Sequence, residues 1–373
     1  MKIAYFVHAV ASCWNNGNAH FLRGVGAALQ AGGHQVQFCE PENAWSESNL
    51  IADHGYGALD GFHRAFPELR RMKYDPENPD IDRLTDGVDL VIVHEWNPPA
   101  LVNLLGQKRA RGARFVLLFH DTHHRALTAP ESMKQYKLDA YDGVLAFGGI
   151  LADLYRRRGW ANRAWAWHEA ADTSLFFPRT SDAQYGDVVW VGNWGDEERT
   201  TELSEYLLQP VSDLGLVTNV FGVRYPASAI DALRGRGISY RGWLANHAVP
   251  EVFAGHRATV HVPRRPYAEA LRGIPTIRVF EALACGIPLV SAPWEDAETL
   301  FPGECFLMAR DGSEMRNKLR AVLNDKALAQ TLRQNGLDAI RERHSCRHRA
   351  HELLAIYHSI KDATFLEQQA EAV

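Results

Sequence analysis

The sequence predicts an α/β protein made of two Rossmann-like, doubly wound domains. Along its 373 residues, short runs of β-branched and aromatic residues alternate with helical patterns. This alternation indicates parallel sheets that are covered by helices on both faces. It stops once, between Trp165 and Asp187, and then a second series begins. Because a chain of this length is typical of about two domains, we expect one domain on each side of the interruption.

The strands are expected where the apolar runs are short and bounded by turn residues. The first series reads KIAYFV, HQVQFCE, DLVIVHE, RFVLLFHD and GVLAFG, and the second reads DVVWVGN, LVTNVFG, ISYRGW, ATVHVP and IPLVSA. Residues 41–87 separate the second run from the third, and they are too many for an ordinary β-α loop. Because this segment mixes proline, aspartate and aromatic residues, we interpret it as a functional insertion.

Composition and charge argue against several classes of protein. The net charge is −5 and the basic residues are dispersed, which disfavours a nucleic-acid-binding surface or a basic membrane patch. No stretch reaches the roughly 20 apolar residues of a membrane-spanning helix. The five cysteines contain no CxxC pair and fit a reducing compartment better than a disulfide framework. The apolar start MKIAYFVHAVAS leads into a loop and a helix, so we interpret it as a strand rather than a signal peptide. The expectation is a cytoplasmic protein without a transmembrane segment.

The first polar cluster follows the first predicted strand. Ligand sites in doubly wound sheets gather at the carboxyl ends of strands, and the segment CWNNGNAH, residues 13–20, lies at such an end. Gly17 allows the backbone to approach a ligand closely, and the start of the next helix offers N–H groups to an anion. A tight turn requires the same residues, so both interpretations stay open at this point.

A second informative segment reads RGIPTIRVFEALACGIPLVSAPW, residues 272–294. Thr276 suits the start of a helix, and Gly286 followed by a proline suits its end. Arg278 and Glu281 are then neighbours, one turn apart. They form either a surface ion pair of little energetic weight or a ligand site, in which the helix start binds a phosphate and the carboxylate accepts hydrogen bonds from a sugar diol.

These segments resemble the GT-B glycosyltransferases, whose two domains face a cleft. The likeness is greatest to the family 4 retaining enzymes and to their spore-protein-like, CgeB-type branch. It is carried by NNGNAHFLRGVGAALQAGGHQVQF, DLVIVHEW, FVLLFHD, HEAADTSLFFP, DVVWVGNW and, most specifically, FEALACGIPLVSAPW. The resemblance implies an acceptor-side domain over residues 1–170 and a nucleotide-sugar domain over 180–345. It also implies that a C-terminal helix, 345–373, packs back on the first domain.

The resemblance implies a nucleotide site in the second domain. The positions that match the family's binding residues are Gly17, Arg199, Arg241, Gly242, Trp243, Thr276, Ile277, Arg278 and Glu281. Glu281 would bind the ribose, the helix start the diphosphate, and Arg199 the leaving phosphates. Gly17 would approach the diphosphate from the other domain, and residues 241–244 would read the base. The family commonly carries a second glutamate eight positions before Glu281, where this chain has Gly273. That glutamate usually binds the donor sugar, so other residues must recognise the sugar in this chain. Arg278, three residues before Glu281, fits the CgeB-type pattern.

The segment HDTHH, residues 120–124, raises the question of a metal site. Its histidines lie where a strand ends and a loop begins. No second carboxylate follows at the spacing of a known metal-binding motif, so we expect no metal. The resemblance places His120 beside the donor sugar as a catalytic residue. Asp121 joins it there, and Glu95, Trp96, His123 and His124 would form the acceptor side. A hydrogen-bonded loop cluster without a substrate is the alternative.

The function expected from the resemblance is transfer of a sugar from a nucleotide diphosphate sugar, which is a co-substrate, to a sugar, peptide or small-molecule acceptor. No cofactor or metal is expected, and retention of the anomeric configuration is favoured. The alternatives are an inverting transferase with His20 as base and a nucleotide-sugar epimerase or hydrolase. A metal-dependent hydrolase built around His94, Glu95, Asp121 and His123 and a catalytically silent nucleotide-sugar binding protein also stay open.

Overall fold

The computed structural model describes residues 1–371, and for residues 365–371 it describes the backbone alone. Contacts divide the chain into two compact units. The first contains Met1–Ser12, Leu22–His168 and the chain from Cys346 onward, and the second contains Cys13–Phe21 and Glu169–Ser345. The chain therefore passes between the units after Ser12, Phe21, His168 and Ser345, and Cys13–Phe21, which includes the glycine loop, belongs to the second unit.

The first unit is built on a parallel sheet of seven strands in the order β3-β2-β1-β4-β5-β6-β7. The strands are β1 (Lys2–Phe6), β2 (Gln35–Pro41), β3 (Arg70–Tyr74), β4 (Leu90–His94), β5 (Val116–Asp121), β6 (Gly143–Ala146) and β7 (Ala164–Ala166). The helices are α1 (Ala19–Ala31), α2 (Trp45–His54), α3 (Asp60–Ala65), α4 (Ile81–Leu84), α5 (Pro99–Ala110), α6 (Arg125–Thr128), α7 (Pro130–Met133), α8 (Gly149–Arg157) and α17 (Cys346–Glu371). β4 and β5 are buried along their whole length, as expected for strands covered on both faces. All five strands predicted for this half are present.

The segment 41–87 contains a strand that the sequence analysis missed. It holds α2, a 3₁₀-helix (Tyr56–Leu59), α3, β3 and α4, and β3 pairs in register with β2. β3 reads RRMKY and lies at the edge of the sheet, where charged side chains are normal and an apolar run is not required. Part of the segment is therefore a regular sheet element, and only its helical part remains a candidate insertion.

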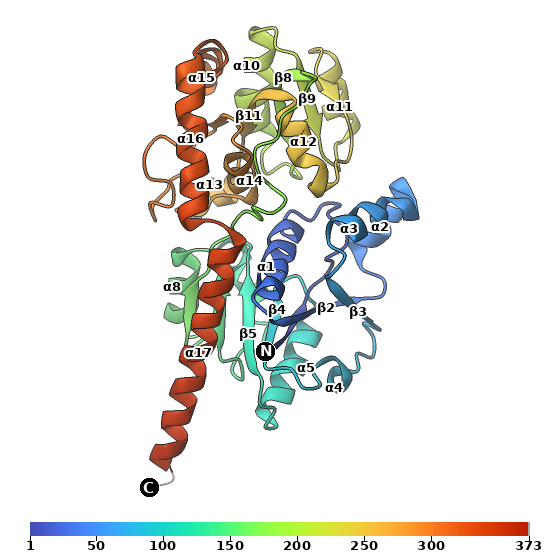
Figure 1. Cartoon of the computed structure of the whole chain (residues 1–373), viewed down its shortest axis with the longest axis vertical. Coiled ribbons are helices and arrows are strands. Elements are labelled where there is room, and N and C mark those ends of the chain that lie inside the picture. Colours follow the sequence, from blue (N-terminus) through green and yellow to red (C-terminus); the bar gives the residue numbers. More distant parts are fainter. Residues whose placement is uncertain (372–373) are drawn as a thin grey trace. The chain divides into compact units, whose positions relative to one another are not determined.

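The second unit is built on a parallel sheet of six strands in the order β10-β9-β8-β11-β12-β13. The strands are β8 (Gly186–Val191), β9 (Thr218–Phe221), β10 (Ser239–Tyr240), β11 (His256–His261), β12 (Leu289–Ser291) and β13 (Leu307–Met308). The helices are α9 (Thr200–Leu203), a π-helix (Ser204–Leu208), α10 (Gln209–Asp213), α11 (Ala227–Arg234), a 3₁₀-helix (Asn246–Ala248), α12 (Val249–Ala254), α13 (Arg265–Glu269), α14 (Ile277–Cys285), α15 (Gly312–Asn324) and α16 (Lys326–Arg343). Helices flank the strands of both units (Figure 1), so the predicted fold class is confirmed.

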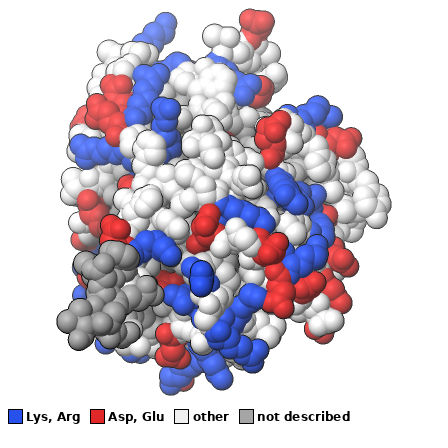
Figure 2. Space-filling model, turned by 60° about the horizontal axis from the view of Figure 1, so that its bottom comes forward, with Lys and Arg blue, Asp and Glu red and all other residues white. Residues whose placement is uncertain are grey.

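The long C-terminal helix α17 belongs to the first unit. It lies beside β5 (Figure 1), and the indole nitrogen of Trp167 donates a hydrogen bond of 2.9 Å to the carbonyl of Arg349. The helix was predicted to extend to residue 373, and residues 372 and 373 lie outside the described part of the chain. Within residues 1–371, none of the helices combines the length and the apolar character that a membrane span requires. Basic and acidic side chains are interspersed over the face drawn in Figure 2.

Candidate functional site

Helix α14 has the boundaries that its sequence predicts. Thr276 is the last residue before it and has extended backbone angles, and Gly286 ends it in the left-handed conformation with φ of 64°. A glycine is favoured at this C-terminal position because it adopts positive φ without steric cost. The hydroxyl of Thr276 lies 3.0 Å from Nε2 of His261, whose Nδ1 lies 2.9 Å from the hydroxyl of Ser291. Burial and the nearby Arg199 lower the pKa of His261 to about 3, so its neutral ring anchors the start of the helix.

Glu281 is a fully buried carboxylate on α14. Its Oε1 accepts a 2.7 Å hydrogen bond from the amide of Asn246 and lies 3.0 Å from Nδ1 of His20, and its Oε2 pairs with Arg278. Burial by itself raises the pKa of a carboxyl group, but Arg278 and His20 outweigh it here and the pKa of Glu281 is lowered. The interpretation of this pair as a surface ion pair is therefore wrong, because the carboxylate is ionised in the interior.

The glycine loop lies beside the start of α14. Nε2 of His20 accepts a 2.8 Å hydrogen bond from the backbone N–H of Asp172, so the ring nitrogen that faces Glu281 is Nδ1, at 3.0 Å. A Cβ atom on Gly17 would lie 3.5 Å from the side chain of Ile277, an ordinary contact distance. The loop, although it comes from the first β-α connection, thus joins the predicted nucleotide-binding residues of the second unit.

Glu169 also belongs to this cluster, although it was not predicted from the sequence as a site residue. It is 4% exposed, and its carboxyl group accepts a hydrogen bond from the backbone N–H of Ile277, the first residue of α14. Burial and the neighbouring charge of Glu281 raise the pKa of Glu169 to about 8, so it carries a proton at neutral pH. Glu169 lies in the segment HEAAD, and no pattern in the sequence places it against a helix more than 100 residues later. The carboxyl group of Glu169 therefore occupies the backbone N–H of Ile277, where the diphosphate of the donor was expected to bind.

Arg199 is held by backbone carbonyls rather than by a carboxylate. Its guanidinium donates to the carbonyl oxygens of Val262 at 3.0 Å and Asn193 at 2.6 Å, and it lies 5.1 Å from the ring centre of Trp190. It forms no ion pair with the described part of the chain, and burial followed by repulsion from Arg264 lowers its pKa to about 10. Gly195 has a φ of 97°, and a Cβ there would come within 2.8 Å of the Arg199 side chain. The loop before α9 is thus shaped around this arginine.

The predicted base-reading loop follows β10. Nε of Arg241 donates a 2.8 Å hydrogen bond to the side chain of Asn219, and Gly242 has a φ of 73°. The carbonyl of Gly242 accepts a 2.8 Å hydrogen bond from Gly222, and Trp243 is half-buried. Residues 241–243 are therefore held at the carboxyl edge of the second sheet, and Asn246, just beyond them, reaches Glu281.

The first unit brings three histidines together at the carboxyl edge of its own sheet. His94 and His120 are register partners in β4 and β5, with ring centres 5.1 Å apart, and His8 follows β1 with its ring 5.9 Å from that of His94. Burial lowers the pKa of His8 to about 4 and that of His120 to about 3, and the pKa of His94 also lies well below its ordinary value. All three rings are therefore neutral at pH 7. His8 was missed as a site residue because it lies within the apolar N-terminal run.

Two carboxyl groups directly follow two of these histidines in the chain: Glu95 follows His94, and Asp121 follows His120. Glu95 accepts hydrogen bonds of 3.0 Å from the hydroxyl of Thr122 and from the guanidinium of Arg125. Asp121 accepts a 2.8 Å hydrogen bond from the hydroxyl of Tyr155 and one of 2.9 Å from the N–H of His123. Burial raises the pKa of both carboxyl groups, and the charge of Asp121 adds to the effect on Glu95. The predicted acceptor residues are thus partly tied into the loop by their own hydrogen bonds.

Trp96 gives this cluster an exposed aromatic face. It is 43% exposed, the guanidinium of Arg125 lies 4.4 Å from its ring centre, and the ring of His123 lies 4.9 Å away at a steep angle. His124 is buried, and its Nδ1 lies 2.7 Å from the hydroxyl of Thr128. Among the described residues, no group of three or more histidine, cysteine, aspartate or glutamate side chains is arranged to hold a metal ion.

Comparisons with known proteins agree with this architecture. Residues 199–355 match the model of a family described as glycosyl transferase-like. No curated protein has significant sequence similarity to the chain. A sucrose-phosphate synthase structure from Thermosynechococcus elongatus is 15% identical, covers 97% of this chain and all of its own, and has a TM-score of 0.65. HepE from Anabaena, in complex with UDP and glucose, is 14% identical over 96% of this chain and all of its own, with a TM-score of 0.66. A glycosyltransferase from Rickettsia africae ESF-5 is 12% identical over 96% of this chain and 99% of its own, with a TM-score of 0.65. The shared fold is that of the GT-B glycosyltransferases, and with the matched family it confirms the enzyme class predicted from the sequence.

Proposed function

We propose that the chain is a retaining, metal-independent glycosyltransferase, family 4-like and of the CgeB-type branch, that uses a nucleotide diphosphate sugar as donor. The observation that carries the proposal is the ionised, fully buried carboxylate of Glu281, held by Arg278, Asn246 and His20 beside the glycine loop. Three donors occupy part of its hydrogen-bonding capacity, and a carboxylate accepts about four. It is therefore suited to accept a hydrogen bond from a ribose hydroxyl.

Positive charge for the leaving diphosphate is available without a metal ion. The N-terminus of α14 carries the partial positive charge of its unpaired N–H groups, and phosphates bind at such helix ends. Arg199 adds a positive charge that forms no direct ion pair with a carboxylate of the described chain, and it is close enough to Arg278 for the two charges to interact. Fixed groups of this kind stabilise charge that develops in a transition state. This supports the metal-independent part of the proposal.

Retention is the proposed stereochemical course. The bond from the sugar's anomeric carbon to the diphosphate breaks, the bond to the acceptor oxygen forms on the same face, and the acceptor proton passes to the departing phosphate oxygen. An inverting enzyme would instead need a base such as His20 with an available nitrogen. Both nitrogens of His20 are engaged, with Asp172 and with Glu281, which argues against that alternative.

Calorimetric titration tests the donor site. We expect at least one of UDP, GDP, CDP and TDP to bind, with UDP tested first because the HepE structure contains it. Glu281→Gln should weaken that binding by about ten-fold to a hundred-fold, since a hydrogen bond to a charged group contributes about 1.5–3 kcal/mol. The matched control is Glu342→Gln, which changes an exposed carboxylate at the end of α16. Unchanged affinity in a folded Glu281→Gln protein would show that the nucleotide site is misplaced.

Donor turnover tests the reaction itself. We expect consumption of the donor sugar to depend on an added sugar, peptide or small-molecule acceptor. Proton NMR of the product should show the anomeric coupling of the donor. Equal consumption with and without every acceptor would favour a nucleotide-sugar hydrolase or epimerase instead, and an inverted coupling would overturn retention.

A further inference from the structure

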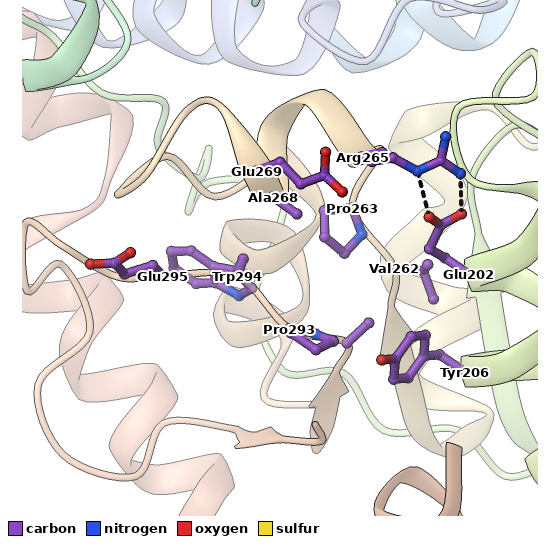
Figure 3. A pocket seen from close by; sticks show the side chains of 11 residues that line it. Glu202, Tyr206, Val262, Pro263, Arg265, Ala268, Glu269, Pro293, Trp294 and Glu295 are labelled. Carbon is purple, nitrogen blue, oxygen red and sulfur yellow. Dashed lines mark hydrogen bonds and ion pairs between the residues drawn. The ribbon is translucent and has the colours of Figure 1, made fainter. Parts of the chain in front are cut away.

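A cavity of about 370 Å³ opens on the second unit, and no residue predicted to bind the nucleotide lines it (Figure 3). Its walls come from the segments that directly follow β11 and β12, and from Glu202 of α9 and Tyr206 of the π-helix. The carboxyl ends of parallel strands are where such sheets bind ligands. The volume lies at the lower end of the range of small-molecule sites, about 300–1,000 Å³. The cavity is therefore large enough for a small ligand, and none of the residues assigned above to the proposed reaction lines it.

The floor of the cavity is apolar. Val262 and Ala292 are buried, and Pro293 and Trp294 continue the same surface. Trp294 is fixed by stacking on Phe306, with ring centres 5.9 Å apart and planes 23° apart. A sugar ring presents C–H groups on its faces and hydroxyl groups around its edge, so an apolar and aromatic floor suits one of its faces.

The rim of the cavity is charged but largely neutralised by its own pairs. Arg265 donates hydrogen bonds of 2.9 and 3.2 Å to the two carboxylate oxygens of Glu202, as drawn in Figure 3. Glu295 pairs with Arg272 at 3.3 Å, and Glu269 completes the rim. A charged ligand gains little from groups that are already paired. A neutral polyol fits better, because its hydroxyls both donate to carboxylates and accept from a guanidinium.

A buried donor in the wall points to the same chemistry. Trp294 is 7% exposed, and its indole N–H has no hydrogen-bond partner within the described part of the chain. Figure 3 shows the nitrogen on the side of the ring nearest Pro293, toward the other lining side chains. Leaving such a group without a partner costs about 1–3 kcal/mol. A hydroxyl group that reached it after a small shift of the loop would recover that energy.

We propose that this cavity is a second carbohydrate site, which binds one neutral sugar ring or a disaccharide outside the nucleotide site. The proposal does not depend on the transferase reaction, because it is carried by residues to which the proposed reaction assigns no role. Binding is tested by saturation-transfer NMR with glucose, galactose, mannose, N-acetylglucosamine and maltose, each titrated against the full chain. Glucosamine and glucose 6-phosphate are the charged probes.

Two variants locate the binding. Ala268→Phe fills the cavity from α13, and Glu202→Gln weakens the rim pair with Arg265 while keeping the side-chain shape. We expect saturable binding of at least one neutral sugar, its loss in Ala268→Phe, and a weakening of about ten-fold in Glu202→Gln. Glu342→Gln is the control and should bind as wild type does. UDP affinity, measured on the same samples, should not change in either cavity variant. This measurement separates the two proposals, because loss of UDP binding would contradict the nucleotide site and loss of sugar binding alone concerns the cavity.

Three results would overturn the proposal. The first is the absence of saturable binding by any neutral sugar. The second is binding of the charged probes alone, which would assign the cavity to an ionic ligand. The third is sugar binding that persists in both Ala268→Phe and Glu202→Gln, which would place the sugar elsewhere, for example in the nucleotide site.

Discussion

Replacing Glu169 by glutamine should change how the stability of the protein depends on pH. The carboxyl group of Glu169 is buried beside the ionised Glu281, and its pKa is raised from 4.5 to about 8. The folded chain thus binds a proton at Glu169 that the unfolded chain has lost above pH 4.5. The favourable contribution of this group is complete below about pH 4.5 and is lost as pH rises through 8. Glutamine keeps an acceptor for the N–H of Ile277 and never ionises.

The size of the effect follows from the shift. Each pKa unit corresponds to about 1.4 kcal/mol, so a rise from 4.5 to about 8 gives Glu169→Gln an advantage over wild type that approaches about 5 kcal/mol above pH 8. This is an upper limit, because glutamine is not a perfect replacement for a protonated carboxyl group. We expect the two proteins to differ by a constant amount below pH 4.5. Between pH 5 and 8, the difference should grow in favour of the variant.

Urea unfolding followed by tryptophan fluorescence at pH 5, 6, 7, 8 and 9 measures this difference, with Glu342→Gln as the control for an exposed carboxylate. A difference between Glu169→Gln and wild type that stays constant across this range would refute the raised pKa. The same group bears on nucleotide binding, because its N–H partner lies where a diphosphate is expected. UDP affinity of wild type should fall as pH rises above about 8, and that of Glu169→Gln should fall less.

Three further outcomes are expected. Donor turnover should survive exhaustive treatment with EDTA, because α14 and Arg199 supply the positive charge; loss that zinc or manganese restores would contradict the metal-independent reaction. His120→Ala should reduce turnover by at least ten-fold and His20→Ala should weaken nucleotide binding through Glu281, so an active His120→Ala protein would remove that ring from the chemistry. Trp96→Ala should raise the KM for the acceptor with little change in UDP affinity; equal losses in both would indicate a structural role for Trp96.

The sequence was sufficient to predict the strands that are buried on both faces. Runs such as LVIVH and VLLFHD are continuous and apolar because helices cover both sides of the sheet. β3 was missed because an edge strand tolerates charge, and its RRMKY pattern carries no apolar run. β7 and β13, which contain three and two residues, were also missed. Boundaries of α14 were predictable because they depend on local backbone chemistry, at Thr276 and Gly286.

Contacts within the candidate site were less predictable, because they join residues that are distant in sequence. Glu281 meets Asn246 and His20, and Glu169 meets the first residue of α14, through the packing of separate loops. The sequence does not encode such distances in a local pattern. Glu281 shows the consequence. One turn of helix predicted its pairing with Arg278, but only the fold determines that the carboxylate is buried and that it has three partners.

The protonation of the buried histidines bears on how the proposed reaction would handle the acceptor proton. His8, His94 and His120 are neutral at pH 7, because burial lowers the pKa of each. A base whose pKa lies as low as that of His120, about 3, takes little part in removing a proton from a hydroxyl group, since efficient general bases have a pKa close to the working pH. A neutral imidazole ring can donate a hydrogen bond to a sugar hydroxyl through one nitrogen and accept one through the other. A donor phosphate oxygen then becomes the most suitable proton acceptor, and that assignment requires the acceptor to approach on the face from which the diphosphate leaves. The test is the pH profile of kcat for the wild type, His120→Ala and His20→Ala. If the wild type shows an ionisation between pH 5 and 8 that either substitution removes, a histidine acts as the base and the assignment is contradicted. The same profile in all three proteins over that range would agree with the assignment.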